Sequence, residues 1–517
     1  MITDLKKISL FCLIPSTLIA GAVAFLNPGQ QPVIGFAAAF LLSWLSSFLL
    51  ALTCAKTNCP RSIVRLTAIS FGLRFLIGLI LFAMLPVFGH NEAPPQAGYL
   101  YLDAYQRDMD AWKLAESSDS LALAFTDEFH SDQYGGLLSL SGAIYRFLSP
   151  DAHRPLLILI LTAFFTSLGL PFFWKALHQR WGEKTALASA FLYALYPESI
   201  ILGASQMREP ILIGLSAIAF WGVIAWNTEK RKALVALVPS LLALVFISMK
   251  AGASLMLAMG IWFWLENLLP RIKPSWQLAS SALLLVAVFG GVYIYWDWLV
   301  DSARWDLYLT EIASGRVQFE LEFIGGRYRT PFIVGYGLTQ PVLPAAIVYP
   351  SIPLARVVAI FRALGWYALV PLMASGFILV WAKQTKEDRR VLLLFFLTVI
   401  AWTLLSSARA GGDQWDNPRY RSIFLIWMVL LAGWAWVQTI TRRSPWLWRL
   451  VLLELIYIGY FLHWYISRYQ GLMVHMRFWR MVALLGRYAL VILVGGFLFD
   501  LVYNKVRKSR QSSSKTE

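Results

Sequence analysis

Charged residues are scarce in this sequence. Only 14% of its 517 residues are Asp, Glu, Lys or Arg, against roughly 25% in ordinary soluble domains, whereas 58% are hydrophobic. The chain therefore lacks the polar surface that several soluble domains of this total length would need. Its apolar runs repeatedly reach the roughly 18 residues that cross a bilayer, so we expect an all-α polytopic membrane protein.

The sequence also lacks the motifs of several soluble enzyme classes. Its three cysteines are too few for a disulfide framework or a zinc cluster. No glycine-rich nucleotide fingerprint, HExxH or GxSxG motif occurs, so soluble-nucleotide chemistry and zinc hydrolysis have no motif support. The net charge of +16 lies in short basic clusters between apolar runs rather than on one continuous face. We therefore expect membrane lipids, and no nucleic acid, as partners.

The apolar runs predict about 14 transmembrane helices. If the amino terminus is inside, all short cytoplasmic connections are basic, for example NTEKRK and KQTKEDRR, and both termini are cytoplasmic. The predicted spans are residues 8–26, 32–54, 66–88, 155–176, 185–203, 209–227, 233–249, 252–269, 277–297, 357–381, 391–407, 422–440, 446–466 and 478–502.

The polar interruptions divide the chain into four parts. We expect an N-terminal helix pair over 1–65, a catalytic core over 66–440, further C-terminal transmembrane helices over 441–503 and a disordered cytoplasmic tail over 504–517. Two long loops of the core, 89–154 and 298–356, fall on the outer face, where short amphipathic helices are expected.

The first outer loop holds a run of charged residues at helical spacing. Asp103, Arg107 and Asp110 fall at i, i+4 and i+7, on one face of a predicted helix. A carboxylate on this face could point into a membrane cavity. The alternative is a solvated amphipathic helix that lies on the bilayer surface.

Further charges recur at the same outer depth of the membrane. Arg208 and Glu209 open one predicted span, and Lys250 closes another; Glu209 alone could be a helix N-terminal acid. The turn ARAGGDQWDNPRYRS adds Arg419 and Arg421, which an exposed loop with local ion pairs could also explain. Arginine binds two phosphate oxygens at once through its planar fork, so the three clusters together predict an anionic lipid substrate.

Four segments in this order resemble the GT-C class of integral membrane glycosyltransferases. They are LDAYQRDMDAWKLA, DQYGGLLSLSGAIYRFLSP, YPESIILGASQMREPILIGL and NPRYRSIFLIW, and the resemblance covers about residues 66–440. The chain is particularly similar to bacterial relatives of the protein O-mannosyltransferases (glycosyltransferase family 39). Where that family often has adjacent acids, Asp103 is followed by Ala104, and the pair Asp127–Glu128 comes later.

This resemblance implies a GT-C-like core in the cytoplasmic (inner) membrane of a bacterium. The implied reaction moves a sugar from a polyprenyl-phosphate donor to a glycan, lipid or protein acceptor on the outer face, with inversion. The implied site has Asp103, by preference, or Asp110 as the catalytic base. It has Arg208, Lys250, Arg419 and Arg421 at the donor phosphate, and Arg107, Glu209, Asp132 and Tyr134 as supporting or substrate-binding residues.

The residues leave other functions open. No cofactor is certain, although Asp103 and a second acid could hold a divalent cation, Mg²⁺ or Mn²⁺. A polysaccharide polymerase or ligase would also act on lipid-linked glycans and would use the 298–356 loop to hold a long glycan. A transporter or flippase would instead place its charges in the middle of its spans. Few charges lie there in this sequence, and Glu454 is an exception.

Overall fold

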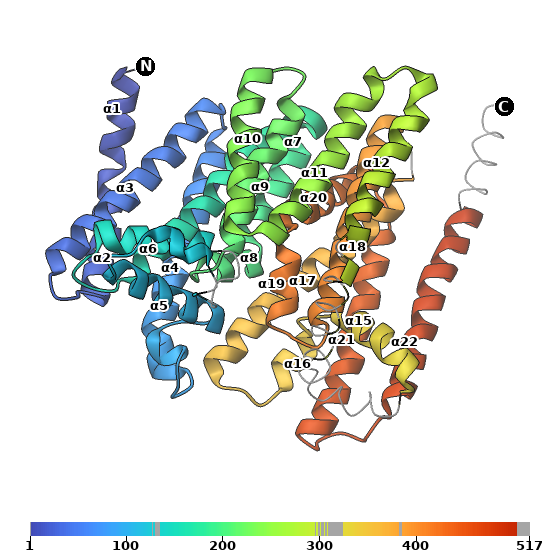
Figure 1. The fold of residues 1–517 in the computed structure, drawn as a ribbon. Coiled ribbons are helices and arrows are strands. Elements are labelled where there is room, and N and C mark those ends of the chain that lie inside the picture. Colours follow the sequence, from blue (N-terminus) through green and yellow to red (C-terminus); the bar gives the residue numbers. More distant parts are fainter. Residues whose placement is uncertain are drawn as a thin grey trace.

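The protein is a bundle of helices, which Figure 1 shows from the side. The computed structural model describes residues 2–126, 128–129, 135–294, 296–297, 300, 304, 308, 324–381 and 385–503, and these ranges contain no β-strand. The α-helices are α1 (Ile2–Phe11), α2 (Leu13–Leu26), α3 (Pro32–Lys56), α4 (Arg61–Phe88), α5 (Leu102–Glu116), α6 (Gly136–Leu148), α7 (Pro155–Leu195), α8 (Pro197–Gly203), α9 (Glu209–Ala225), α10 (Lys230–Ile247), α11 (Met249–Phe263), α12 (Pro274–Ile294), α15 (Gly326–Gly337), α16 (Leu343–Val348), α17 (Pro353–Leu379), α18 (Lys386–Ala410), α19 (Asp416–Ser422), α20 (Leu425–Arg442), α21 (Trp446–Tyr469) and α22 (Phe478–Leu490). Short 3-10 or π turns are η1 (Pro95–Ala97), η2 (Leu121–Phe125), η3 (Trp264–Leu268), η4 (Leu269–Arg271) and η6 (Val491–Gly495).

Ten helical segments of the described chain are long and apolar enough to cross a membrane, so the chain is an all-α, multi-pass membrane protein. They are Lys6–Leu26, Pro32–Lys56, Arg61–Phe88, Pro155–Leu195, Met249–Arg271, Pro353–Leu379, Lys386–Ala410, Leu425–Arg442, Trp446–Tyr469 and Phe478–Tyr503. This number is smaller than the 14 expected from the sequence. One reason is that α7 covers two predicted spans, and another is that α9 has only 17 residues.

Helix α7 reverses its direction near Gly182. The φ of Gly182 is 81°, a left-handed conformation that side chains with a Cβ rarely adopt. The Tyr193 hydroxyl donates to the Thr166 carbonyl oxygen at 2.8 Å, although 27 residues of straight helix would separate them by about 40 Å. The two limbs of α7 therefore lie side by side, with the turn between the predicted spans 155–176 and 185–203.

A buried arginine ties α4 to the end of α7. Arg74 is fully buried, and its guanidinium donates to Ser70 Oγ at 2.7 Å, to Ser199 Oγ at 3.0 Å and to the Ala194 carbonyl oxygen at 3.0 Å. The last carbonyls of a helix have no partner within it, and their partial negative charge attracts a cation. Arg74 thus satisfies the end of α7 where Tyr196 interrupts the helix.

A buried ion pair then fixes α8 against α17. Arg362 contacts both carboxylate oxygens of Glu198, at 2.6 and 2.8 Å, and both side chains are 1% exposed. Arg362 also donates to the Trp415 carbonyl oxygen at 2.7 Å and lies over the Trp415 ring. The residue just before α19 is therefore held by the same guanidinium that joins α8 to α17.

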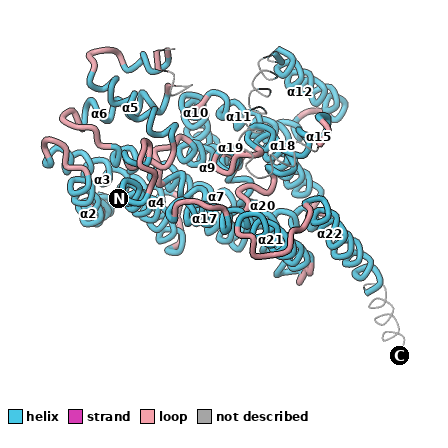
Figure 2. The backbone as a smooth tube through the Cα atoms, turned by 90° about the horizontal axis from the view of Figure 1, so that it is seen from below, coloured by secondary structure: helices cyan, strands magenta, loops and turns pink. Residues whose placement is uncertain are grey.

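The ends of the chain lie apart from this region. In Figure 1 the start of α1 lies at the upper end of the bundle, α5 lies lower, and the last helical segment stands at the right-hand edge. Figure 2 shows α22 at the edge of the bundle, far from the packed pair α5 and α6. Arg449 of α21 ties this peripheral segment to the bundle through Asp500, at 2.7 Å.

Because α7 and α9 pack closely, we expect a larger side chain at their contact to destabilise the fold. A Cβ at Gly214 of α9 would lie 1.9 Å from the Phe165 carbonyl oxygen, whereas a Cβ at Gly72 of α4 would meet nothing within 4 Å. We expect Gly214→Ala to lower the free energy of unfolding by about 1–3 kcal/mol, because α9 must move away. Gly72→Ala should be neutral or slightly stabilising. Thermal unfolding in detergent measures both, and equal melting temperatures would contradict the close packing.

Candidate active site

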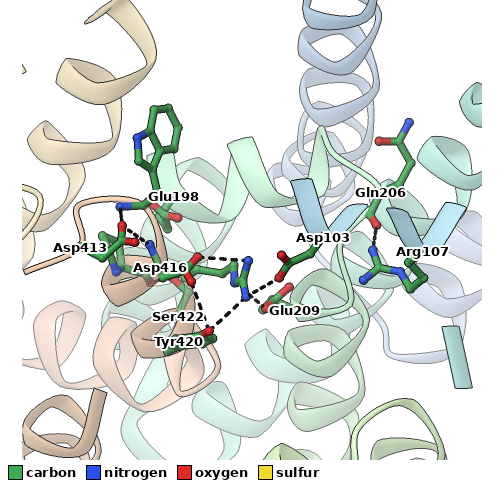
Figure 3. Close-up of polar contacts among 12 residues, drawn as sticks. Asp103, Arg107, Glu198, Gln206, Glu209, Asp413, Asp416, Tyr420 and Ser422 are labelled. Atoms are coloured by element: carbon green, nitrogen blue, oxygen red, sulfur yellow. Dashed lines mark hydrogen bonds and ion pairs between the residues drawn. The ribbon is translucent and has the colours of Figure 1, made fainter. Parts of the chain in front are cut away.

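Helix α5 carries Asp103, Arg107 and Asp110, as the i, i+4, i+7 spacing predicted, but the three side chains do different things. Asp103 lies in the first turn, where a helix favours an acid, and its side chain is 49% exposed. Arg107 is buried and donates to the Gln206 carbonyl oxygen (Figure 3). Asp110 forms an ion pair with the exposed Lys113 at 3.3 Å. Among these three, only Asp103 forms an ion pair with Arg419.

Arg419 of α19 is the centre of the site. Its guanidinium lies 2.9 Å from Asp103, 3.3 Å from Glu209 and 3.2 Å from Asp416. These acids come from α5, α9 and α19, and Figure 3 shows their carboxylates turned toward one another. Arg419 is 3% exposed, and Tyr420 lies beneath it with its ring 4.9 Å from the guanidinium carbon. One buried cation therefore joins three chain segments that are far apart in the sequence.

The three acids around Arg419 differ in their access to solvent. Glu209 is 1% exposed, whereas the side chains of Asp103 and Asp416 are 49% and 36% exposed. One oxygen of Glu209, Oε2, is buried and has no hydrogen-bond partner among the residues that the structure describes. The site thus offers a bound ligand two accessible carboxylates and one buried acceptor that is still unsatisfied.

Electrostatics separates the two accessible acids. Burial alone would raise the pKa of the Asp103 carboxyl, but contact with Arg419 and the nearby charges of Arg107 and Arg208 lower it below its usual range. Burial raises the pKa of Asp416, and the nearby acids raise it further, so that it lies above its usual value despite the attraction of Arg419. As the pH falls, Asp416 therefore takes up a proton first, while Asp103 remains ionised at neutral pH.

The proposed phosphate-binding cations do not all meet at Arg419. Arg208 is the residue before α9 and is close enough to lower the pKa of Asp103. Arg421 is fully buried, donates to the Gln340 carbonyl oxygen at 2.7 Å and lies 3.3 Å above the Trp366 ring. Lys250 lies in the first turn of α11 and takes part in none of the three ion pairs of Arg419 described above. Asp132 and Tyr134 lie outside the described residues.

The site has members that the sequence analysis did not select. Asp416 and Tyr420 complete the surroundings of Arg419, with the Tyr420 hydroxyl donating to Asp416 at 3.3 Å. Both lie within the turn that had supplied Arg419 and Arg421, so the i, i+3 spacing of Asp416 and Arg419 was a readable signal. No group of three or more His, Cys, Asp or Glu in the described chain is arranged to hold a metal ion.

A buried acid on α5 was also missed. Asp108 is 2% exposed and accepts hydrogen bonds from Tyr99 at 2.6 Å and Tyr145 at 2.7 Å, and it lies 2.9 Å from His153 Nε2. Burial acts to raise the pKa of Asp108, but His153 and the two hydroxyls lower it. Asp108 anchors α5 to α6 and to the start of α7, which fixes the helix that presents Asp103. Its position on the face of α5 that holds Ala104 and other small apolar residues was the available signal.

Removal of Arg419 should destabilise the fold because Glu209 would remain buried without its cation. We expect Arg419→Met to lower the free energy of unfolding by about 3–5 kcal/mol, the usual cost of breaking a buried ion pair. Adding Glu209→Gln should recover part of this loss, since a neutral amide costs less to bury than a carboxylate.

Arg449→Met provides the matched control for this change. Arg449 pairs with Asp500 at 2.7 Å, but the two side chains are 18% and 26% exposed, so about 0–1 kcal/mol is expected. Denaturant unfolding of the purified protein in detergent compares the variants. Equal losses for Arg419→Met and Arg449→Met would show that Arg419 stabilises the fold no more than a surface pair does.

No protein-family model matches the chain, and no curated protein sequence matches it. These comparisons therefore identify no family.

Proposed function

We propose that this protein is a membrane glycosyltransferase that moves a sugar from a polyprenyl-phosphate donor to an acceptor, with inversion. The observation that carries the proposal is the group around Arg419: a half-exposed Asp103, a buried Glu209 with one unsatisfied oxygen, and a buried cation. This group stands among apolar helices, where a lipid-linked donor can reach it. The GT-C-like order of the sequence segments supports the same reaction.

Asp103 is suited to take a proton from the acceptor. In the proposed reaction an acceptor hydroxyl oxygen attacks the anomeric carbon, the bond from that carbon to the phosphate oxygen breaks, and the hydroxyl proton passes to Asp103. The polyprenyl phosphate leaves with the bonding electrons. A single displacement of this kind inverts the anomeric centre. Arg419, which contacts Asp103, and Arg208, whose charge lowers the pKa of Asp103, are the proposed cations that stabilise the charge on the leaving phosphate.

Donor binding would also change the strength of Asp103 as a base. In the structure Arg419 holds Asp103 at 2.9 Å and keeps its pKa low, which makes the carboxylate a weak base. A donor phosphate that takes one edge of the Arg419 guanidinium competes with Asp103 for it. The pKa of Asp103 then rises toward its usual value, so the base becomes stronger when the donor is in place. Glu209 would keep Arg419 in position during this exchange.

The expected orientation is part of the proposal. We infer a fourteen-span GT-C-like arrangement in the cytoplasmic membrane of a bacterium, with both termini in the cytoplasm and the Arg419 site toward the outer face. Counting the two limbs of α7 as two spans instead of one, and adding α9, α10 and α12, would supply the four spans beyond the ten long apolar segments. Basic connections such as NTEKRK, at the end of α9, support a cytoplasmic location for that side.

Cysteine labelling tests this orientation. A single cysteine in place of Ser444, between α20 and α21, should react with a membrane-impermeant maleimide only after the membrane is opened. A cysteine in place of Asp119, in the exposed segment after α5, should react in intact cells. The reverse pattern would overturn the orientation, and labelling of both positions in intact cells would overturn the number of spans between them.

The proposed base is tested by the release of polyprenyl phosphate from polyprenyl-phosphate sugars in detergent, where a transporter would release none. Asp103→Asn should lower turnover by about 10²-fold or more, because the amide cannot accept the proton. Donor affinity should rise or stay the same, because the donor phosphate no longer competes with a carboxylate for Arg419. Glu116→Gln, which changes an exposed acid at the other end of α5, is the matched control and should leave turnover unchanged.

The phosphate contact is measured in the same preparations. Arg208→Ala should weaken polyprenyl-phosphate binding by about tenfold or more, the scale of one charge-assisted hydrogen bond, and lysine should restore it only in part.

Wild-type turnover in Asp103→Asn would move the base to Asp110 or Glu128. Unchanged affinity in Arg208→Ala would remove the phosphate role of that residue, and absence of any polyprenyl-phosphate release would contradict the proposed reaction itself.

A further inference from the structure

A carboxylate lies deep within α21, away from the site around Arg419. Glu454 is the only acidic residue of α21 and lies eight residues beyond Trp446, about 12 Å along the helix axis. It forms no hydrogen bond or ion pair with any residue that the structure describes. An ionisable group at this depth is costly, and such groups usually face a partner, a cavity or a ligand.

Glu454 lines a cavity between α17, α21 and the end of α15. The cavity has a volume of about 210 Å³, and no lysine or arginine is among its lining residues. Apart from Glu454 and Thr339 its wall is aliphatic or aromatic, and the aromatic residues that line it are Trp366, Tyr367 and Tyr457. The Tyr457 hydroxyl is buried and has no hydrogen-bond partner in the described part of the chain. The cavity therefore combines one ionisable carboxyl group, an unused polar atom and several aromatic rings.

The aromatic rings narrow the class of ligand. Carboxylates and aromatic faces both attract cations, and together they are the usual surroundings of a bound ammonium group. Trp366 already carries the Arg421 guanidinium over its ring at 3.3 Å, so a ligand cation would use Tyr367 and Tyr457 instead. These two rings lie 6.1 Å apart, centre to centre, and are tilted by 39°. The apolar wall requires the rest of the ligand to be hydrophobic.

We propose that this cavity binds an organic ammonium ion with an apolar body, and that its positive charge lies between the Glu454 carboxylate and the rings of Tyr367 and Tyr457. The proposal does not depend on the glycosyltransferase reaction, because the cavity uses none of the residues around Arg419. The ammonium group could belong to a membrane aminolipid or to a free amphiphilic amine, and both present the same chemistry to the cavity.

Binding of radiolabelled phenyltrimethylammonium to the full-length protein in phosphatidylglycerol nanodiscs tests the proposal. Saturable binding is expected in the wild type, and Glu454→Gln should weaken it by at least about tenfold, since the amide keeps the shape but loses the charge. Tyr457→Leu should weaken binding by about threefold to tenfold. Glu387→Gln, at an exposed acid in the first turn of α18, is the matched control and should bind as the wild type does.

A neutral compound of the same shape as the probe tests whether binding requires the positive charge. tert-Butylbenzene has the shape of phenyltrimethylammonium without its charge, so it should displace the labelled cation at least about tenfold less effectively. Equal binding by the wild type and Glu454→Gln, or equal displacement by the two compounds, would overturn the proposal. Absence of saturable binding to the wild type would overturn it as well.

The lipid composition identifies the source of the ammonium group. If phosphatidylethanolamine in the nanodiscs weakens probe binding to the wild type but not to Glu454→Gln, an aminolipid occupies the cavity. If it changes neither, the occupant is a free amine. Both results support an ammonium site, because they are read only after binding has been shown to depend on Glu454.

Discussion

Buried guanidinium groups must find oxygen acceptors, and this requirement determines how the helices are oriented. Lipid tails are as apolar as the side chains that face them, so apolar packing alone gives helices in a membrane little preference for one rotation over another. Arg74, Arg362 and Arg419 are each at most 3% exposed, and each contacts oxygens from two or more segments. Their cost of burial is recovered only in one mutual arrangement of those segments.

These contacts form a chain that leads to the site. Arg362 holds Glu198 of α8 and the Trp415 carbonyl oxygen, which places the start of α19. Helix α19 then presents Arg419, and Arg419 joins Asp103 and Glu209. On the opposite side, Asp108 fixes α5 through Tyr145 and His153. Asp103 is thus held from both directions although it is itself half exposed, and this combination of a fixed backbone and an accessible side chain suits a reacting group.

The sequence predicted the parts of this structure that depend on local pattern. Apolar runs located the helices, and the i, i+4, i+7 spacing located α5 and its face with Asp103. The basic connection between two apolar runs predicted the turn near Gly182. The burial of Arg421 did not follow, because Arg419 and Arg421 are two residues apart and a helix turns by about 200° between them. Which of the two faces the acids depends on α17, with Trp366, and on Gln340, more than 50 residues away. The partners of Asp108 likewise come from α6 and beyond, so spacing within α5 could indicate that Asp108 lies on the buried face but not which residues it contacts.

The seven residues of α19 join two environments that are otherwise separate. Arg419 at one face of this short helix contacts the acids, whereas Arg421 at the other lies against Trp366, whose ring is also part of the wall of the cavity in the membrane. A helix of two turns moves as one body. If the proposed anion binds at Arg419 and a ligand in the cavity displaces Trp366, α19 couples the two events, and thermodynamic reciprocity then requires each ligand to change the affinity for the other by the same factor.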